Sequence, residues 1–151
     1  MYIPEHFTIQ EMVPPTLYKQ IAHRGASWAW TTLFDQRLLV TMDRIRNEFG
    51  RMEVNTWHNG GGGLMDIKGL KYRGFRPCSC TVGSLLSQHR FGRGVDMFTL
   101  DTEVKVVRRA ILSAPNSAMW QYIGAIETDI PWLHIDTRGR IQHGQIMTFK
   151  P

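Results

Sequence analysis

The sequence is poor in cysteine and has no long apolar run. Its two cysteines are Cys78 and Cys80, and a pair two positions apart cannot cross-link distant parts of a chain. We therefore expect free thiols, because a structural zinc site usually takes four ligands. No apolar run is long enough to cross a bilayer, and the first residues lack the basic-then-apolar layout of a secretory signal. These absences predict a protein that begins in the cytoplasm and does not enter a membrane.

Repeats, low-complexity segments and charged linkers are also absent from the sequence. The length of 151 residues and the 42% hydrophobic content suit one domain with a real core. We expect that domain to span residues 1–151 and to be monomeric. The net charge of +5 favours an anionic partner, without choosing between nucleic acid and a bacterial envelope.

Hydrophobic spacing predicts two helices and several strands. A helical repeat runs over Phe34–Phe49, the first regular element that we expect, and Gly50 is placed to end it. Met52–Trp57 alternates like a strand. A second helix should begin with Asp101 or Thr102 as its cap and end before the Ala-Pro-Asn-Ser segment. The pattern predicts an α+β fold with a small, mainly antiparallel sheet and flanking helices.

Two segments bring together residues that bind metals. In the segment SQHRFGRGVD, residues 87–96, glycines allow a tight turn that lets His89 and Asp96 converge. In the segment PWLHIDTRG, residues 131–139, a strand repeat sends His134 to one face and its apolar neighbours to the other. Two imidazoles and one carboxylate, with a position left for water, are typical of catalytic zinc. Other first-row metals remain open.

These two segments resemble motifs of a known family. The first is similar to the S-x-H-x-x-G-x-A-x-D signature of zinc D-alanyl-D-alanine carboxypeptidases and phage L-alanyl-D-glutamate endopeptidases, with Gly94 at the alanine position. The second resembles their late W-x-H-x-D motif, and residues 74–77, GFRP, resemble an upstream GYR segment. The resemblance implies the fold that these peptidases share with the hedgehog signalling domain.

The resemblance also implies roles for individual residues. Zinc would be held by His89, Asp96 and His134. Several family members carry their general base at the position of Pro131, which cannot accept a proton, so the base is expected at Glu127, with Asp129 as the alternative. Arg76 is expected to stabilise the oxyanion or to bind a substrate carboxylate. Asp136 and Ser87 are expected to orient the site rather than to bind the metal.

The implied function is hydrolysis of peptide bonds in bacterial peptidoglycan. The protein would be a bacteriophage endolysin or a virion-associated lysin, cytoplasmic until host lysis or carried on the virion, with peptidoglycan peptide as its partner and no nucleic acid or membrane. Carboxypeptidase and endopeptidase action both remain open. The alternative is a non-catalytic zinc-containing binding module of the same fold. A nuclease site at His58 lacks a partner histidine.

Two further expectations concern the surroundings of the site. Trp57 and Trp132 are aromatic residues that can line a substrate groove. The run Gly60–Gly63 is expected to form a loop, and it lacks the lysine and the serine or threonine of a phosphate-binding motif. Nucleotide binding is therefore not expected.

Overall fold

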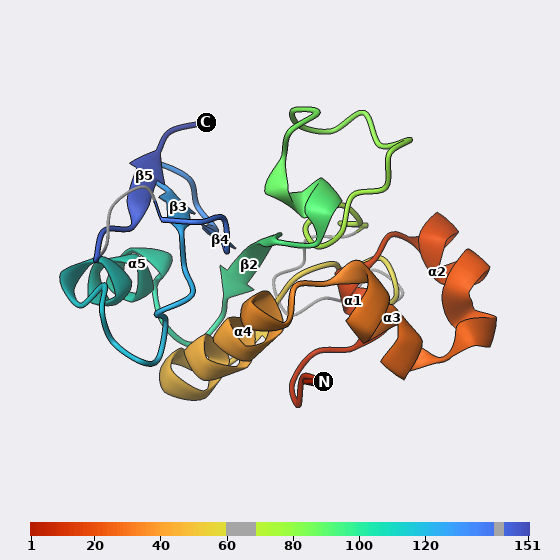
Figure 1. Ribbon diagram of the computed structural model, residues 1–151, viewed down its shortest axis with the longest axis horizontal. Helices are drawn as coiled ribbons and strands as arrows, with labels where there is room; N and C mark the ends of the chain where they lie inside the picture. Colours follow the sequence, from red (N-terminus) through yellow and green to blue (C-terminus); the bar gives the residue numbers. More distant parts are fainter. Residues whose placement is uncertain (60–68, 141–143) are drawn as a thin grey trace.

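The computed structural model describes residues 1–59, 69–140 and 144–151, so the predicted loop Gly60–Gly63 lies outside the described residues. Figure 1 shows the arrangement of the elements along the chain. In order these are α1 (Ile9–Met12), α2 (Pro15–Ile21), the 3-10 turn η1 (Ala22–Arg24), α3 (Ala26–Leu33), α4 (Gln36–Phe49), β1 (Met52–Glu53), the 3-10 turn η2 (Gln88–Phe91), β2 (Gly94–Thr99), α5 (Val104–Ser113), β3 (Ala125–Glu127), β4 (Leu133–Asp136) and β5 (Met147–Phe149).

Within the described residues the strands form a five-stranded sheet in the order β1-β2-β4-β3-β5. β2 pairs antiparallel with β1 and with β4, and β3 pairs antiparallel with β4. β5 pairs parallel with β3 at the edge of the sheet. The predicted α+β class is therefore confirmed, with a mixed sheet in which antiparallel pairs predominate.

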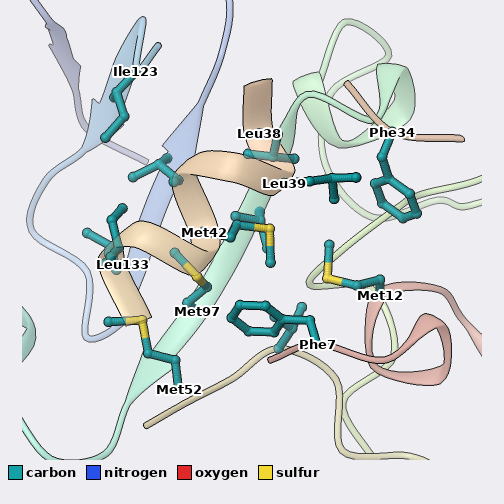
Figure 2. Close-up of a cluster of buried hydrophobic side chains, with 14 of the residues drawn as sticks. Phe7, Met12, Phe34, Leu38, Leu39, Met42, Met52, Met97, Ile123 and Leu133 are labelled. Carbon is teal, nitrogen blue, oxygen red and sulfur yellow. The ribbon is translucent and has the colours of Figure 1, made fainter. Parts of the chain in front are cut away.

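The core lies between α4 and one face of the sheet. Asp35 caps α4 by accepting a hydrogen bond from the Arg37 backbone N–H, and Gly50, with φ of 89°, ends it as predicted. Figure 2 shows the apolar side chains of this helix turned toward the strands. Fully buried residues at this contact are Leu38, Leu39, Met42 and Ile45 from the helix and Val95, Met97, Leu133 and Ile135 from the strands. The other face of the sheet is thereby left available for a site.

The predicted strand at Met52–Trp57 is wrong beyond its first two residues. After Glu53 the backbone leaves the sheet, because its N–H groups find partners in helix α1 and in the loop that contains Leu70. Asn55 N–H donates to the Glu11 carbonyl at 3.1 Å, and Thr56 N–H donates to the Leu70 carbonyl at 3.0 Å. Alternating residue type predicts an extended chain, but it does not predict which partner that chain finds.

The predicted caps of α5 are also wrong. Glu103 is the N-terminal cap residue of that helix, and its side chain makes no capping hydrogen bond. Asp101 instead accepts hydrogen bonds from Arg51, and the Thr102 hydroxyl donates to the Phe49 carbonyl at 2.8 Å. Both polar side chains therefore link α5 to the end of α4. The helix does end before Ala114, as expected.

Helices also precede the segment that we expected to be the first regular element. Thr8 caps α1 through its hydroxyl, and α2 has a proline at its first position. A side-chain cap and an N-terminal proline are both helix-start signals. These helices are short, so hydrophobic periodicity alone did not reveal them. Among the described residues, no helix is both long and apolar enough to span a bilayer.

Candidate metal centre

The centre is built on one row of side chains that crosses the sheet. Asp96 on β2 is directly opposite His134 on β4. The register between β3 and β4 sets Glu127 at the same level, and Glu127 is paired in turn with Phe149 on β5. Directly opposed residues of neighbouring strands project from the same face. Strand register therefore gathers an aspartate, a histidine, a glutamate and a phenylalanine from distant parts of the sequence.

His89 reaches this row from η2, the turn that leads into β2. Gly92 ends the turn with φ of 64°, and a Cβ atom at this position would collide with the Leu33 carbonyl. Glycine is required here on both counts. The Gly92 carbonyl also accepts a hydrogen bond of 3.0 Å from the Asp35 N–H, which anchors the turn to the start of α4. The two-glycine turn predicted from the sequence thus places the imidazole beside Asp96.

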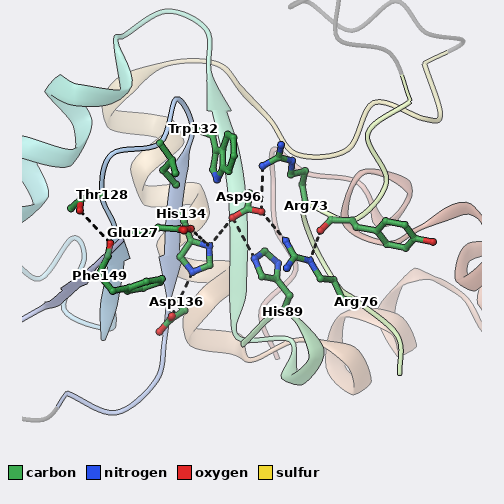
Figure 3. A network of polar contacts seen from close by, with 12 residues as sticks. Arg73, Arg76, His89, Asp96, Glu127, Thr128, Trp132, His134, Asp136 and Phe149 are labelled. Carbon is green, nitrogen blue, oxygen red and sulfur yellow. Dashed lines mark hydrogen bonds and ion pairs between the residues drawn. The ribbon is translucent and has the colours of Figure 1, made fainter. Parts of the chain in front are cut away.

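The three predicted metal ligands meet in the structure. The Oδ1 atom of Asp96 is 3.3 Å from His89 Nε2 and 2.6 Å from His134 Nδ1, and one ligand atom from each residue lies within 4.8 Å of the others. All three residues are buried. Figure 3 shows their side chains converging beside β2. This buried group can hold a metal ion.

The surroundings of the two imidazoles fit a metal site. The Nδ1 atom of His89 is 2.8 Å from the Gly74 carbonyl, so Nδ1 carries the proton and Nε2 presents its lone pair toward Asp96. Among the described residues, the buried Nε2 atom of His134 has no hydrogen-bond partner, and it lies 3.6 Å from Asp136 Oδ2. If Nδ1 of His134 binds a metal, Nε2 carries the proton and points it at that carboxylate. Asp136 is therefore placed to orient His134, as the sequence predicts.

Charge in the centre also suits cation binding. Burial lowers the pKa of His89, so this imidazole is neutral at neutral pH. Burial alone would raise the pKa of Asp96, but the neighbouring imidazoles outweigh it and hold that pKa well below its usual value. His134 is different: burial opposes its protonation, but Asp136 and Asp96 outweigh burial and raise its pKa to about 9. In the metal-free protein, His134 shares a proton with Asp96.

Two arginines approach the second oxygen of Asp96. Arg76 Nη2 lies 3.0 Å from Asp96 Oδ2, while Arg76 Nε donates to the Tyr72 carbonyl at 2.7 Å. Arg73 Nη1 lies 3.5 Å from the same oxygen. The sequence identified Arg76 but not Arg73. The available signal was the position of Arg73, directly before the GFRP segment.

The two candidate bases occupy different surroundings. Glu127 Oε2 lies 4.0 Å from His134 Nδ1, and its side chain is 15% exposed. Asp129 has a left-handed backbone with φ of 61°, its side chain is 61% exposed, and it pairs with Lys150 at 2.9 Å. Glu127 therefore lies next to the metal cluster in the partly buried centre, whereas Asp129 is at the surface.

A cavity of about 800 Å³ opens over this row. Trp132 lines it as predicted, but Trp57 does not, because its indole N–H donates to the Val13 carbonyl and its ring packs near Tyr18. Five cationic side chains and two carboxylates line the cavity: Lys71, Arg73, Arg76, Arg138, Lys150, Asp96 and Glu127. Phe149 also lines it, 5.6 Å from His134 between ring centres. Phe149 was not predicted from the sequence, because the parallel pairing of β5 with β3 brings it to the cavity.

The remaining candidates lie outside the cluster. Cys78 and Cys80 are free thiols, as predicted, and neither belongs to the metal-binding group. Ser87 precedes η2 and lines the cavity, but its hydroxyl makes no capping hydrogen bond. His58 packs against Trp57 and is not part of the cluster.

The site is therefore defined by its own geometry. Comparisons with protein-family models, with curated proteins and with solved structures found no match to this chain. The likeness to zinc peptidases stays a prediction that rests on the two sequence motifs.

Proposed function

We propose that the protein is a zinc-dependent peptidase that hydrolyses peptide bonds of bacterial peptidoglycan. The observation that carries the proposal is the buried His89, Asp96 and His134 cluster, which lies in a cavity wall beside a carboxylate that is not one of its ligands. A ligand set of two imidazoles and one carboxylate leaves positions open for water and substrate, as in catalytic rather than structural zinc sites.

Three residues at the centre have distinct tasks in such a reaction. Zinc in this site would lower the pKa of a coordinated water to about 7 and polarise the scissile carbonyl. Glu127 accepts the proton of the attacking water and returns it to the leaving amine. Arg76 holds Asp96 in position, and it is also the candidate for stabilising negative charge on the carbonyl oxygen. Asp136 orients His134.

The substrate class rests on the sequence motifs and on the charge of the cavity. The motifs resemble those of peptidases that cut peptidoglycan stem peptides and cross-bridges. The cationic lining suits such peptides, because they carry free carboxylates. We propose that the protein acts as a phage endolysin or as a virion-associated lysin, and that its substrate is the cell wall of the host.

The proposal can be tested by digesting purified peptidoglycan and analysing the released products by mass spectrometry. Zinc-loaded protein should release peptides, a chelator should abolish release, and added zinc should restore it. His134→Ala should be inactive, whereas Arg109→Gln, a change on the exposed face of α5, should be fully active. New internal amino termini would identify an endopeptidase, and release of single D-amino acids a carboxypeptidase.

A negative digestion would contradict the proposal in a specific way. If the protein binds one zinc ion per chain and binds peptidoglycan but releases nothing, it is a non-catalytic binding module. If it binds no zinc, both the peptidase and the binding-module hypotheses are wrong.

A further inference from the structure

Arg73 differs from the other arginine at the centre in how its guanidinium is held. Its backbone is fixed at both ends, because its N–H donates to Asn55 Oδ1 at 2.9 Å and its carbonyl accepts from the Asp96 N–H at 2.8 Å. Its guanidinium carbon lies 3.9 Å from the ring centre of Trp132 and 5.2 Å from that of Phe98. Two aromatic rings therefore hold the planar group in one orientation.

The pairing of β2 with β4 positions the two aromatic residues, Phe98 and Trp132, next to each other. Phe98 on β2 and Trp132 just before β4 lie one step beyond the Met97 and Leu133 pair, and their ring centres are 6.3 Å apart. They therefore form the row next to the one that carries Asp96 and His134. Stacking of Arg73 on this row brings its charge to the edge of the metal cluster.

Most of the hydrogen-bonding capacity of Arg73 is unused. A guanidinium has five N–H donors, yet within the described residues the Arg73 side chain has only the 3.5 Å ion pair with Asp96 Oδ2. Arg76 makes the shorter contact with the same oxygen and also binds the Tyr72 carbonyl. Two cations thus share one carboxylate, and the 21% exposed side chain of Arg73 lines the cavity. Its free donors are available to a ligand there.

We propose that Arg73 is a specificity-determining residue that binds a free carboxylate of the substrate next to the scissile bond. This inference rests on the proposed peptidase function and names the feature that the site selects. An oriented guanidinium suits a carboxylate, because it can donate two parallel hydrogen bonds. The preferred substrates are peptides with an unblocked carboxylate beside the bond that is cut.

The distance from Arg73 to the cluster limits where that carboxylate can be. Arg73 touches one oxygen of Asp96, and the other oxygen of the same carboxylate faces the two histidines. An extended residue spans at most about 3.6 Å, so a carboxylate on Arg73 belongs to a residue that flanks the scissile bond or to the next one. Figure 3 shows Arg73 and Glu127 on opposite sides of Asp96. The carboxylate and the general base therefore approach the bond from different sides.

Two chemical sources can supply this carboxylate. One is the C-terminal α-carboxylate of the substrate, which a carboxypeptidase would recognise. The other is a free carboxylate within the peptide, such as that of a glutamate linked through its side chain. Matched peptides distinguish them: one pair differs only in a C-terminal acid or amide, and the other only in an internal glutamate carboxylate or its amide.

The test compares wild type, Arg73→Gln, Arg73→Lys and the control Arg109→Gln at equal zinc content. The rate constant kcat/KM is measured for each peptide. Dissociation constants are measured by calorimetry with Glu127→Gln protein, in which hydrolysis is suppressed, with and without Arg73→Gln. Wild type should favour the acid of one pair over its amide by about tenfold or more. Arg73→Gln should abolish that preference yet still act on the amide, and Arg73→Lys should keep part of it.

The outcomes separate this inference from the proposed function. An acid preference that persists in zinc-loaded Arg73→Gln, or its absence in an active wild type, overturns the role of Arg73 and leaves the peptidase proposal standing. If no peptide is hydrolysed, the peptidase proposal fails. The dissociation constants then decide the role of Arg73 alone: equal binding of acid and amide overturns it, and acid-selective binding that Arg73→Gln abolishes supports it.

Discussion

At the residue scale, Glu127 and Asp129 make different predictions despite their similar chemistry. Glu127 lies 4.0 Å from His134 and lines the cavity, whereas Asp129 is paired with Lys150 at the surface. Glu127→Gln should retain zinc, because the residue is not a ligand, and should lose at least about 10²-fold in kcat. Asp129→Asn should change kcat less than about threefold. Assays on purified peptidoglycan at equal zinc content measure both. An inactive Asp129→Asn variant together with an active Glu127→Gln variant would make Asp129 the general base instead.

His134 makes zinc affinity depend on pH. In the metal-free protein its pKa is raised to about 9, because Asp136 and Asp96 outweigh the effect of burial. The ring is therefore protonated at neutral pH, and zinc must displace that proton. Affinity should rise by at least about tenfold per pH unit between about pH 6 and 8.

Calorimetry in buffers of different ionisation enthalpy tests whether zinc displaces the His134 proton, because it counts the protons that are released on binding. Asp96 and His89 contribute none, since the pKa of each is already lowered. At pH 7 at least about one proton should be released per zinc ion, one from His134 and a further fraction from a zinc-bound water with a pKa of about 7. Zinc binding without proton release would show that His134 is not a ligand through the atom that holds the proton.

At the scale of elements, Glu11 couples α1 to the chain that leaves β1. Its carboxylate accepts from the Val54 N–H at 3.4 Å, and burial raises its pKa to about 7 from the usual 4.5. Between these pH values the folded protein keeps a proton that the unfolded chain has released, so this residue lowers stability as pH rises through the window. Glu11→Gln should remove that loss and stabilise the protein at pH 8 by on the order of 1 to 3 kcal/mol.

The measurement is urea unfolding of wild type, Glu11→Gln and the exposed control Glu48→Gln at pH 4.5 and pH 8. The free energy of unfolding of Glu11→Gln relative to wild type should increase with pH, while that of Glu48→Gln should stay constant. A constant difference for Glu11→Gln would mean that its pKa is close to the usual value in the folded protein.

Elements were predictable from sequence where their signals are local. The helix at Gln36–Phe49 has a periodic apolar face, and its cap and terminal glycine directly adjoin it in the sequence. The length of the strand that begins at Met52 was overestimated. Beyond Glu53 its backbone hydrogen-bonds to Glu11 and Leu70, which come from other parts of the chain. The cluster of His89, Asp96 and His134 was predictable because two short motifs carry it. Arg73 and Phe149 were not, since stacking and parallel strand pairing bring them to the cavity.

At the scale of the whole molecule, net charge and cavity charge have the same sign. The chain carries +5, and the cavity is lined by more cationic than anionic side chains. Attraction to an anionic cell wall should weaken as salt screens it. Hydrolysis of intact peptidoglycan should therefore slow several-fold between about 50 and 500 mM NaCl. A short peptide with amidated carboxylates, assayed in parallel, should be much less affected. Equal salt dependence for both substrates would contradict a role for the overall charge.

The most direct test of the account is a crystal structure of the zinc-loaded protein with anomalous scattering data at the zinc edge. One anomalous peak per chain is predicted, within about 2.0 to 2.2 Å of His89 Nε2, Asp96 Oδ1 and His134 Nδ1, with Glu127 outside the ligand set. A peak held by other residues, or no peak at this cluster in protein that contains stoichiometric zinc, would contradict it.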